Sequence, residues 1–166
     1  MRGKTGAMLI TLLIAICLSG CSSSDEVHSE EQLFSYKNSP IGDNSAVINI
    51  IGQLKHAEEF NEVSLQTKTE PYGMTLTYSA LKAPVTEKEY EETAIYNATF
   101  LFALIDHAEW VTFEFVDMED RAFNLTKDEL EQWYGQDLSE IASEEELEKL
   151  VQEQLADGHD VARLLE

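Results

Sequence analysis

The sequence predicts an α+β fold: an antiparallel four-stranded sheet, made of two hairpins, packed on helices in the order α-β-β-α-β-β-α-α. Two observations carry this prediction. Several short segments alternate apolar and polar residues, as half-buried strands do, and several longer ones repeat apolar residues at the spacing of an amphipathic helix. The chain has 166 residues, of which 43% are hydrophobic, and it therefore has the size and apolar content of one folded domain.

The first predicted elements are a short helix and a hairpin. The segment Asp43–Ser45 supplies three consecutive residues that are favoured at a helix N-cap. Apolar residues then follow at positions i, i+3, i+4 and i+7, namely Val47, Ile50, Ile51 and Leu54. Two alternating segments joined by a Pro- and Gly-containing turn predict a β-hairpin over residues 62–79.

The next predicted elements are a central helix and a second hairpin. Thr86 and Glu89 have the spacing of a capping box, which opens a helix that we expect to run to about His107. Its broad apolar face predicts that this helix is buried. The third strand is indicated by Val111, Phe113 and Phe115, which alternate with Trp110, Thr112 and Glu114. A polar turn over 117–120 leads to a fourth strand around residues 123–125.

Two helices complete the prediction. Thr126 and Glu129 form a second capping box, and Gly135 suits the C-terminal end of a helix over residues 127–134. Ser143 and Glu146 form a third box before a helix with a narrow apolar stripe. We therefore divide the chain into a signal peptide over 1–20, an acidic tether over 21–31, the α+β domain over 32–138 and an acidic C-terminal helix over 139–166.

The N-terminus has the order of features found in an exported, lipid-modified protein. Arg2 and Lys4 precede an almost continuous apolar run, which is too short to span a bilayer and fits a secretory signal. The run ends in Leu18–Cys21, which resembles the lipobox of bacterial lipoproteins. The resemblance implies cleavage between Gly20 and Cys21 and a covalent diacylglycerol on the Cys21 sulfur. The alternative is a plain signal peptide or an uncleaved anchor with Cys21 as an ordinary thiol.

The charge of the chain restricts the classes of partner that it can bind, and its cysteine content restricts the disulfides that it can form. The chain has 32 acidic and 11 basic residues, a net charge of −21, and this disfavours nucleic acid because phosphate binding requires Lys and Arg. Cleavage after Gly20 would remove two basic residues and no acidic one, which gives −23. It would also remove Cys17, so that no disulfide could form. Like charges repel anionic polymers and headgroups, and we expect a cationic peptide, protein or small ligand to be favoured.

The remaining residues carry no recognisable catalytic or metal-binding motif. The sequence has no Gly-x-Ser-x-Gly elbow, no His-Glu-x-x-His helix and no Gly-rich phosphate loop. The four histidines are scattered, and His107 suits the negative end of a helix. We assign no catalytic residue, no metal ligand and no cofactor other than the lipid. Paired carboxylates, which leave no sequence signature, keep a hydrolase acting in the cell-wall space as an alternative.

A candidate pocket is suggested by four polar or aromatic residues: Asn97, Tyr72, Trp133 and Tyr134. Asn97 lies inside the apolar central helix, where its amide needs hydrogen-bond partners. It either bonds locally, the interpretation we favour, or lines a pocket. We interpret Trp133 and Tyr134 as a helix end packed on the core. The alternative is an exposed aromatic patch that binds a ligand.

The domain resembles a family of small lipoproteins from Gram-positive, Bacillus-like bacteria that share a C-terminal domain of unknown function. The matching stretches are Tyr36–Val47, Leu65–Lys68 with Pro71–Gly73, Asn97 with Leu101–Ile105, and Trp133–Gly135. The resemblance covers Leu33 to Leu138 and implies no activity. Similar domains occur on the outer side of membrane proteins that look like antirepressor-type sensors, which implies sensing or partner binding.

Taken together, these features predict a lipid-anchored protein on the extracytoplasmic face of the cell membrane. Its domain is expected to act as a ligand- or partner-binding or sensor domain rather than as an enzyme. Two alternatives are kept: the cell-wall-space hydrolase with paired carboxylates, and a purely structural lipoprotein with no ligand.

Overall fold

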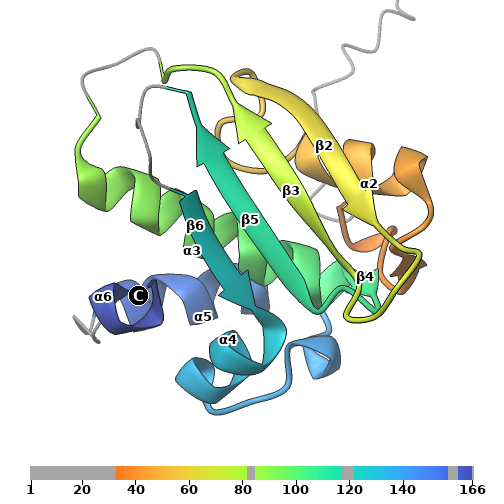
Figure 1. Ribbon diagram of the computed structural model, residues 1–166. Coiled ribbons are helices and arrows are strands. Elements are labelled where there is room, and N and C mark those ends of the chain that lie inside the picture. Colours follow the sequence, from red (N-terminus) through yellow and green to blue (C-terminus); the bar gives the residue numbers. More distant parts are fainter. Residues whose placement is uncertain (1–32, 82–84, 117–121, 157–160, 166) are drawn as a thin grey trace, which may run out of the picture.

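The structure is a computed structural model that describes residues 33–81, 85–116, 122–156 and 161–165 (Figure 1). The predicted signal peptide, the cleavage and lipidation residues Gly20 and Cys21, and the tether over 21–31 lie outside the described residues, as does the predicted turn over 117–120. Of the helices in the described part, none is long and apolar enough to cross a bilayer.

The main sheet has four strands in the order β2-β3-β5-β6. They are β2 (Phe60–Gln66), β3 (Gly73–Tyr78), β5 (Trp110–Phe115) and β6 (Ala122–Thr126). The two predicted hairpins are present, because β2 pairs antiparallel with β3 and β5 pairs antiparallel with β6. The two central strands, β3 and β5, run parallel to each other. The sheet is therefore mixed, and the predicted all-antiparallel sheet is wrong.

A second departure from the prediction is a small parallel sheet, in which β1 (Ser39–Pro40) pairs with β4 (Ile105–Asp106). The parallel pairing in the main sheet has its cause in α3 (Glu87–Leu104), the helix between β3 and β5. A helix placed between two strands carries the chain back to the end where the first strand began, so that the second strand is added parallel to the first. Alternation of residues predicts which face of a strand is buried, but it does not predict which strand lies next to it.

The helices begin close to the residues expected from their capping signals. Helix α2 (Asn44–Ile51) starts after Asp43, whose carboxylate accepts hydrogen bonds from the backbone N–H groups of Ser45 and Ala46 at 3.1 Å. Both of the capping boxes that open α3 and α4 (Lys127–Tyr134) are present. Gly135 ends α4 in the left-handed conformation, at φ 73°, which glycine adopts without strain.

The central helix ends earlier than predicted. Its last residue is Leu104, because Ile105 and Asp106 leave the helix to pair with β1. His107 therefore lies in the connection to β5 with φ 62° and does not occupy the end of the helix. From residue 93 to its end α3 is buried on most sides, as expected, since the sheet covers one side and other helices lie beside it (Figure 1).

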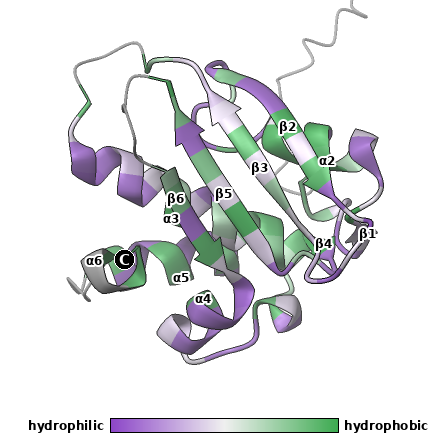
Figure 2. Ribbon diagram, in the orientation of Figure 1, coloured by the Kyte–Doolittle hydropathy of each residue, from purple (hydrophilic) through white to green (hydrophobic). Residues whose placement is uncertain are grey.

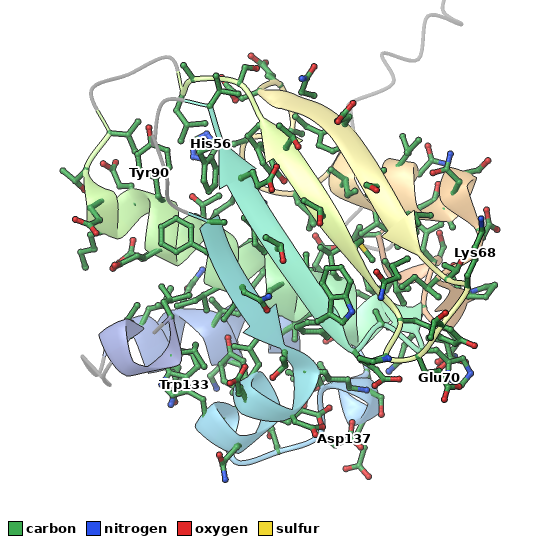
Figure 3. All side chains as sticks on the ribbon, in the orientation of Figure 1. His56, Lys68, Glu70, Tyr90, Trp133 and Asp137 are labelled. Atoms are coloured by element: carbon green, nitrogen blue, oxygen red, sulfur yellow. The ribbon has the colours of Figure 1, made fainter. Side chains whose placement is uncertain are left out.

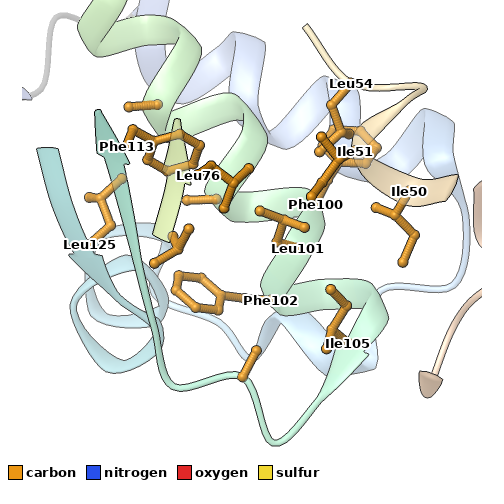
Figure 4. Close-up of a cluster of buried hydrophobic side chains, with 14 of the residues drawn as sticks. Ile50, Ile51, Leu54, Leu76, Phe100, Leu101, Phe102, Ile105, Phe113 and Leu125 are labelled. Carbon is orange, nitrogen blue, oxygen red and sulfur yellow. The ribbon is translucent and has the colours of Figure 1, made fainter. Parts of the chain in front are cut away.

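The core lies between α3 and one face of the main sheet (Figure 4). The inward residues of the strands are apolar and buried: Met74, Leu76, Tyr78, Val111, Phe113, Phe115, Phe123 and Leu125. They meet the fully buried Phe100, Leu101 and Phe102 of α3. Burial of apolar surface on this scale supplies the main stabilisation of a domain that has no disulfide among its described residues.

The acidic C-terminal segment packs on the same core. A short 3-10 turn, η1 (Leu138–Glu140), leads to α5 (Glu144–Ala156) and then to α6 (Val161–Leu164). Leu147 and Val151 of α5 are buried, and Glu148 accepts a hydrogen bond from the hydroxyl of Tyr96 on α3 at 3.0 Å. The third predicted box is present in part. The backbone N–H of Glu146 donates to Ser143, but the carboxylate of Glu146 accepts from Ala142.

Candidate functional site

Asn97, the first residue of the predicted pocket, is fully buried on α3 and its amide is used within the protein. Its Oδ1 accepts a hydrogen bond from the backbone N–H of Lys55 at 3.1 Å. Its Nδ2 donates to the carbonyl of Lys55 at 3.0 Å and to the hydroxyl of Tyr78 at 3.2 Å. The side chain thus ties the segment after α2 to the helix and to β3, and the buried amide has hydrogen-bond partners within the protein, as buried polar groups generally do.

Trp133 and Tyr134 pack at the end of α4. The Tyr134 hydroxyl lies 2.8 Å from Oγ1 of Thr99 on α3, and the rings of Trp133 and Tyr134 meet edge to face at 4.9 Å. The carbonyl of Trp133 accepts a hydrogen bond from Gln154 of α5. Its indole Nε1 is buried and has no hydrogen-bond partner in the described part of the chain. The Tyr134 hydroxyl and the Trp133 carbonyl thus join α4 to α3 and α5.

The four predicted pocket residues therefore lie in three separate environments. Tyr72 belongs to the loop between β2 and β3, where its carbonyl accepts from the backbone N–H of Glu109 at 2.9 Å. Asn97 faces Lys55 and Tyr78, and Trp133 lies among the helices, away from the loop that carries Lys68 and Glu70 (Figure 3). The contacts of these residues do not bring them together into one site.

A different surface is presented by the outer face of the main sheet. All described helices lie behind or beside the sheet, and none crosses its outer face (Figure 1). The strands alternate between apolar and polar residues (Figure 2), and the polar ones are on the whole the more exposed. We call this surface the open face. Paired residues across the strands form its three rows: Gln66-Gly73-Trp110-Thr126, Ser64-Thr75-Thr112-Asn124 and Glu62-Thr77-Glu114-Ala122.

Trp110 covers one end of the open face. It is paired with Gly73 across the parallel strands, and a Cβ atom on Gly73 would lie 2.2 Å from the indole ring. The ring thus rests directly on the glycine backbone, which is why Gly73 is buried although it faces outward. The indole Nε1 donates a hydrogen bond to the carbonyl of Pro71 at 3.0 Å. These two contacts fix the ring in one position while leaving it half-buried.

Glu62 and Glu114 lie at the other end of the open face, on the two sides of Thr77. Both are exposed, and the Thr77 hydroxyl donates to Oε2 of Glu114 at 3.4 Å. No Lys, Arg or His occurs among the residues that form the three rows. The open face therefore combines hydroxyl and amide groups with two carboxylates and one aromatic ring.

Titratable groups elsewhere have ordinary structural roles. His56 Nδ1 lies 3.7 Å from Oε2 of Glu59, and Nε2 of the exposed His107 lies 3.8 Å from Asp106. The backbone N–H of Thr86 lowers the pKa of Glu89, as the capping role of that carboxylate requires. Burial raises the pKa of Tyr78 to about 12. In the described ranges, no group of three or more His, Cys, Asp or Glu side chains is placed to hold a metal ion.

The open face is not among the sites predicted from the sequence. The outward positions of Trp110, Thr112 and Glu114 were visible in the alternation of the third strand, but Glu62 and Thr77 were not linked to them. The missing signal is strand order, because Glu62 and Glu114 share a row only when β3 lies between β2 and β5.

Comparison with known proteins identifies the domain but no activity. The family described as "Domain of unknown function (DUF4825)" matches residues 33–126. The match includes α3 and all four strands of the main sheet, and hence the whole open face, and it stops where α4 begins. No curated protein and no solved structure matches the chain.

Proposed function

Because the chain belongs to the DUF4825 family, a domain of unknown function, we propose a function from its own sequence and geometry: it is a lipid-anchored extracytoplasmic lipoprotein whose domain binds a partner. The partner is a peptide, protein or small ligand, and a cationic one is favoured. Binding of this kind suits a sensor domain, as the resemblance to the outer domains of membrane sensors implies.

The observation that carries the proposal is the one-sided packing of the main sheet. Described helices cover only its inner face, whereas the outer face presents a continuous polar surface of three residue rows. Three threonines on the outer side of the two central strands, Thr75, Thr77 and Thr112, are partly exposed and place hydroxyl groups on this surface. Rigid strands that present polar groups to solvent are a suitable scaffold for recognition of another molecule.

Membrane attachment is supported by the order of residues at the N-terminus. A basic start, an apolar run and the lipobox-like Leu18–Cys21 have the arrangement that lipoprotein processing requires. Each buried lipid CH₂ group contributes about 0.8 kcal/mol, so that two or more long acyl chains on Cys21 hold a protein on a membrane stably. The acidic segment 21–31 would then separate the domain from the bilayer.

Attachment is tested by fractionating cells that express the full chain or the Cys21→Ser variant. We expect the native chain in the membrane fraction, with the mass of a diacylglycerol added to an N-terminus at Cys21, and we expect the variant to lose both the lipid and membrane retention. A native chain that is unmodified and begins at Met1 would contradict the proposed anchoring.

Partner binding is tested in two steps. The lipidated protein is first used to pull down partners from membranes, and the binding of cationic peptides to it is then measured at low and at high salt. We expect specific capture that weakens as salt rises, since the partner is recognised partly by charge. Ligand binding should also raise the unfolding temperature of the domain. If no cationic peptide binds at low salt, the preference for a cationic partner is wrong.

A further inference from the structure

We propose that the open face binds an extended basic segment of a partner protein, with one cationic side chain over the Trp110 ring and another over Thr77, between Glu62 and Glu114. This inference rests on the proposed partner-binding function and goes beyond it, because it assigns the surface, the conformation of the bound segment and the spacing of its charges.

The first contact is the ring of Trp110. One face of the indole rests on Gly73, and its N–H group is already bonded to the Pro71 carbonyl. The part of the ring left accessible is therefore the π face that points away from the sheet. A Lys or Arg placed over a Trp ring is attracted by the negative face of the ring, and Trp is the best of the aromatic residues for this contact. The ring is preorganised, so little side-chain freedom is lost when a cation binds.

The second contact is the row Glu62-Thr77-Glu114. Neighbouring strands are about 4.8 Å apart, and the two glutamates therefore flank Thr77 at about that distance on each side. A cationic group placed above Thr77 is within reach of both carboxylates. Both carboxylates are exposed, and no basic side chain of the open face competes for them. Charge complementarity thus selects a cation at this end.

The spacing of the two contacts defines the segment. Trp110 and Glu114 are four residues apart on the same face of β5, and a strand rises about 3.3 Å per residue, which separates them by about 13 Å. An extended peptide that lies along β5 has its residues i and i+4 the same distance apart and on the same side. Between them, the hydroxyls of Thr75 and Thr112 offer hydrogen bonds to the peptide backbone.

A second copy of this chain is disfavoured as the occupant, because both copies would bring Glu62 and Glu114 to a shared surface and carry a large negative charge. The same charges disfavour anionic polymers. A basic segment satisfies both the carboxylates and the ring, and we take it as the occupant.

The test uses the full lipidated chain in non-ionic detergent and a fluorescent peptide in which two lysines lie four positions apart in a Ser- and Thr-rich sequence. Binding is followed by fluorescence anisotropy at low salt. The comparison peptide has the same composition with the two lysines adjacent. We expect the spaced peptide to bind about tenfold more tightly than the adjacent one, because only the spaced lysines reach both contacts.

Two sets of variants locate the binding. E62Q/E114Q and W110L should each lower the affinity for the spaced peptide about tenfold. The matched control E140Q/E145Q removes the same charge from exposed positions on η1 and α5 and should change affinity less than about twofold. Thermal unfolding measures whether each variant is folded. If W110L does not fold, E62Q/E114Q still tests the surface, because the side chains that it changes are exposed.

The outcomes separate the surface from the function. The open face is the wrong surface, while partner binding stands, in either of two cases. In the first, E62Q/E114Q and E140Q/E145Q lower the affinity for the peptide equally. In the second, the spaced and the adjacent peptide bind with the same affinity. If peptide affinity is unchanged in E62Q/E114Q, or if the open face instead mediates self-association that these variants abolish, the inference is overturned. Failure of every cationic peptide at low salt is the separate result that removes the cationic partner from the proposed function.

Discussion

The indole of Trp110 occupies the space that a side chain at Gly73 would need, since a Cβ atom there would lie 2.2 Å from the ring. The two residues are direct partners across the parallel pair of strands, β3 and β5. This contact joins the two hairpins on the outer side of the sheet, as the packing of α3 does on the inner side. It also makes Gly73 a position where the absence of a side chain is required by packing.

Gly73→Ala should therefore destabilise the domain. The new methyl group must displace the Trp110 ring from its bond to Pro71, and overpacking of this kind costs roughly 1–3 kcal/mol. Urea denaturation of the variant measures the loss. Gly42→Ala is the matched control, because Gly42 has nothing within 4 Å of its Cβ position. Equal losses in the two variants would contradict a special role for the contact with Trp110.

Asn97→Ala should destabilise the domain by about 2–3 kcal/mol, since it leaves Lys55 and Tyr78 without their buried hydrogen-bond partner. Asn49→Ala, at an exposed position of α2, serves as the control and should change the free energy of unfolding by less than about 0.5 kcal/mol. A stable Asn97→Ala variant would show that the amide is not the link between α2, α3 and β3.

The tyrosines of the core predict a loss of stability at high pH. Burial raises the pKa of Tyr78 from 10.0 to about 12, and burial also raises the pKa of Tyr134. A raised folded-state pKa means that the neutral phenol is favoured in the folded protein. The stability from this effect is fully present below pH 10 and is lost as pH rises toward 12.

Unfolding free energies measured between pH 9 and 12 check this expectation. Tyr78→Phe has no phenol to ionise at that position, and its stability should fall less steeply with pH than that of the native chain, by up to about 2–3 kcal/mol across the window. The same slope in both proteins would mean that Tyr78 ionises without cost in the folded state.

Leu147→Ala should show that α5 is part of the folded unit, although the family match ends at residue 126. Leu147 is fully buried in the shared core, and removal of a buried leucine side chain costs roughly 2–5 kcal/mol. Gln152→Ala on the exposed side of α5 should have little effect. A single cooperative unfolding transition with a lower midpoint is expected for Leu147→Ala. An unchanged midpoint would mean that α5 contributes nothing to domain stability.

The sequence predicted the features of this fold that depend on neighbouring residues. The capping boxes at Thr86 and Thr126, the stop at Gly135 and the inward faces of the strands are all determined by local spacing and side-chain type. Strand order and direction depend on how the hairpins meet, and residue alternation carries no information about that. The pairing of β1 with β4 involves two residues in each strand, too few to produce a detectable pattern.

The same distinction explains the candidate site. Outward positions such as Trp110 and Glu114 could be predicted from alternation within one strand. Their combination with Glu62 and Gly73 could not, because these residues lie on other strands whose order was unknown. The predicted pocket residues were chosen for their chemistry, but Asn97 and Tyr134 use their polar groups in bonds that hold the helices and the sheet together.

The parallel pairing of β3 with β5 also affects how the chain folds. Each hairpin closes between segments that are near in sequence, but the two hairpins can join only after the whole of α3 has been placed between them. Closing this larger loop costs chain entropy before its contacts form, and such late, non-local contacts slow folding. We expect the two halves of the sheet to assemble independently and their union to limit the folding rate.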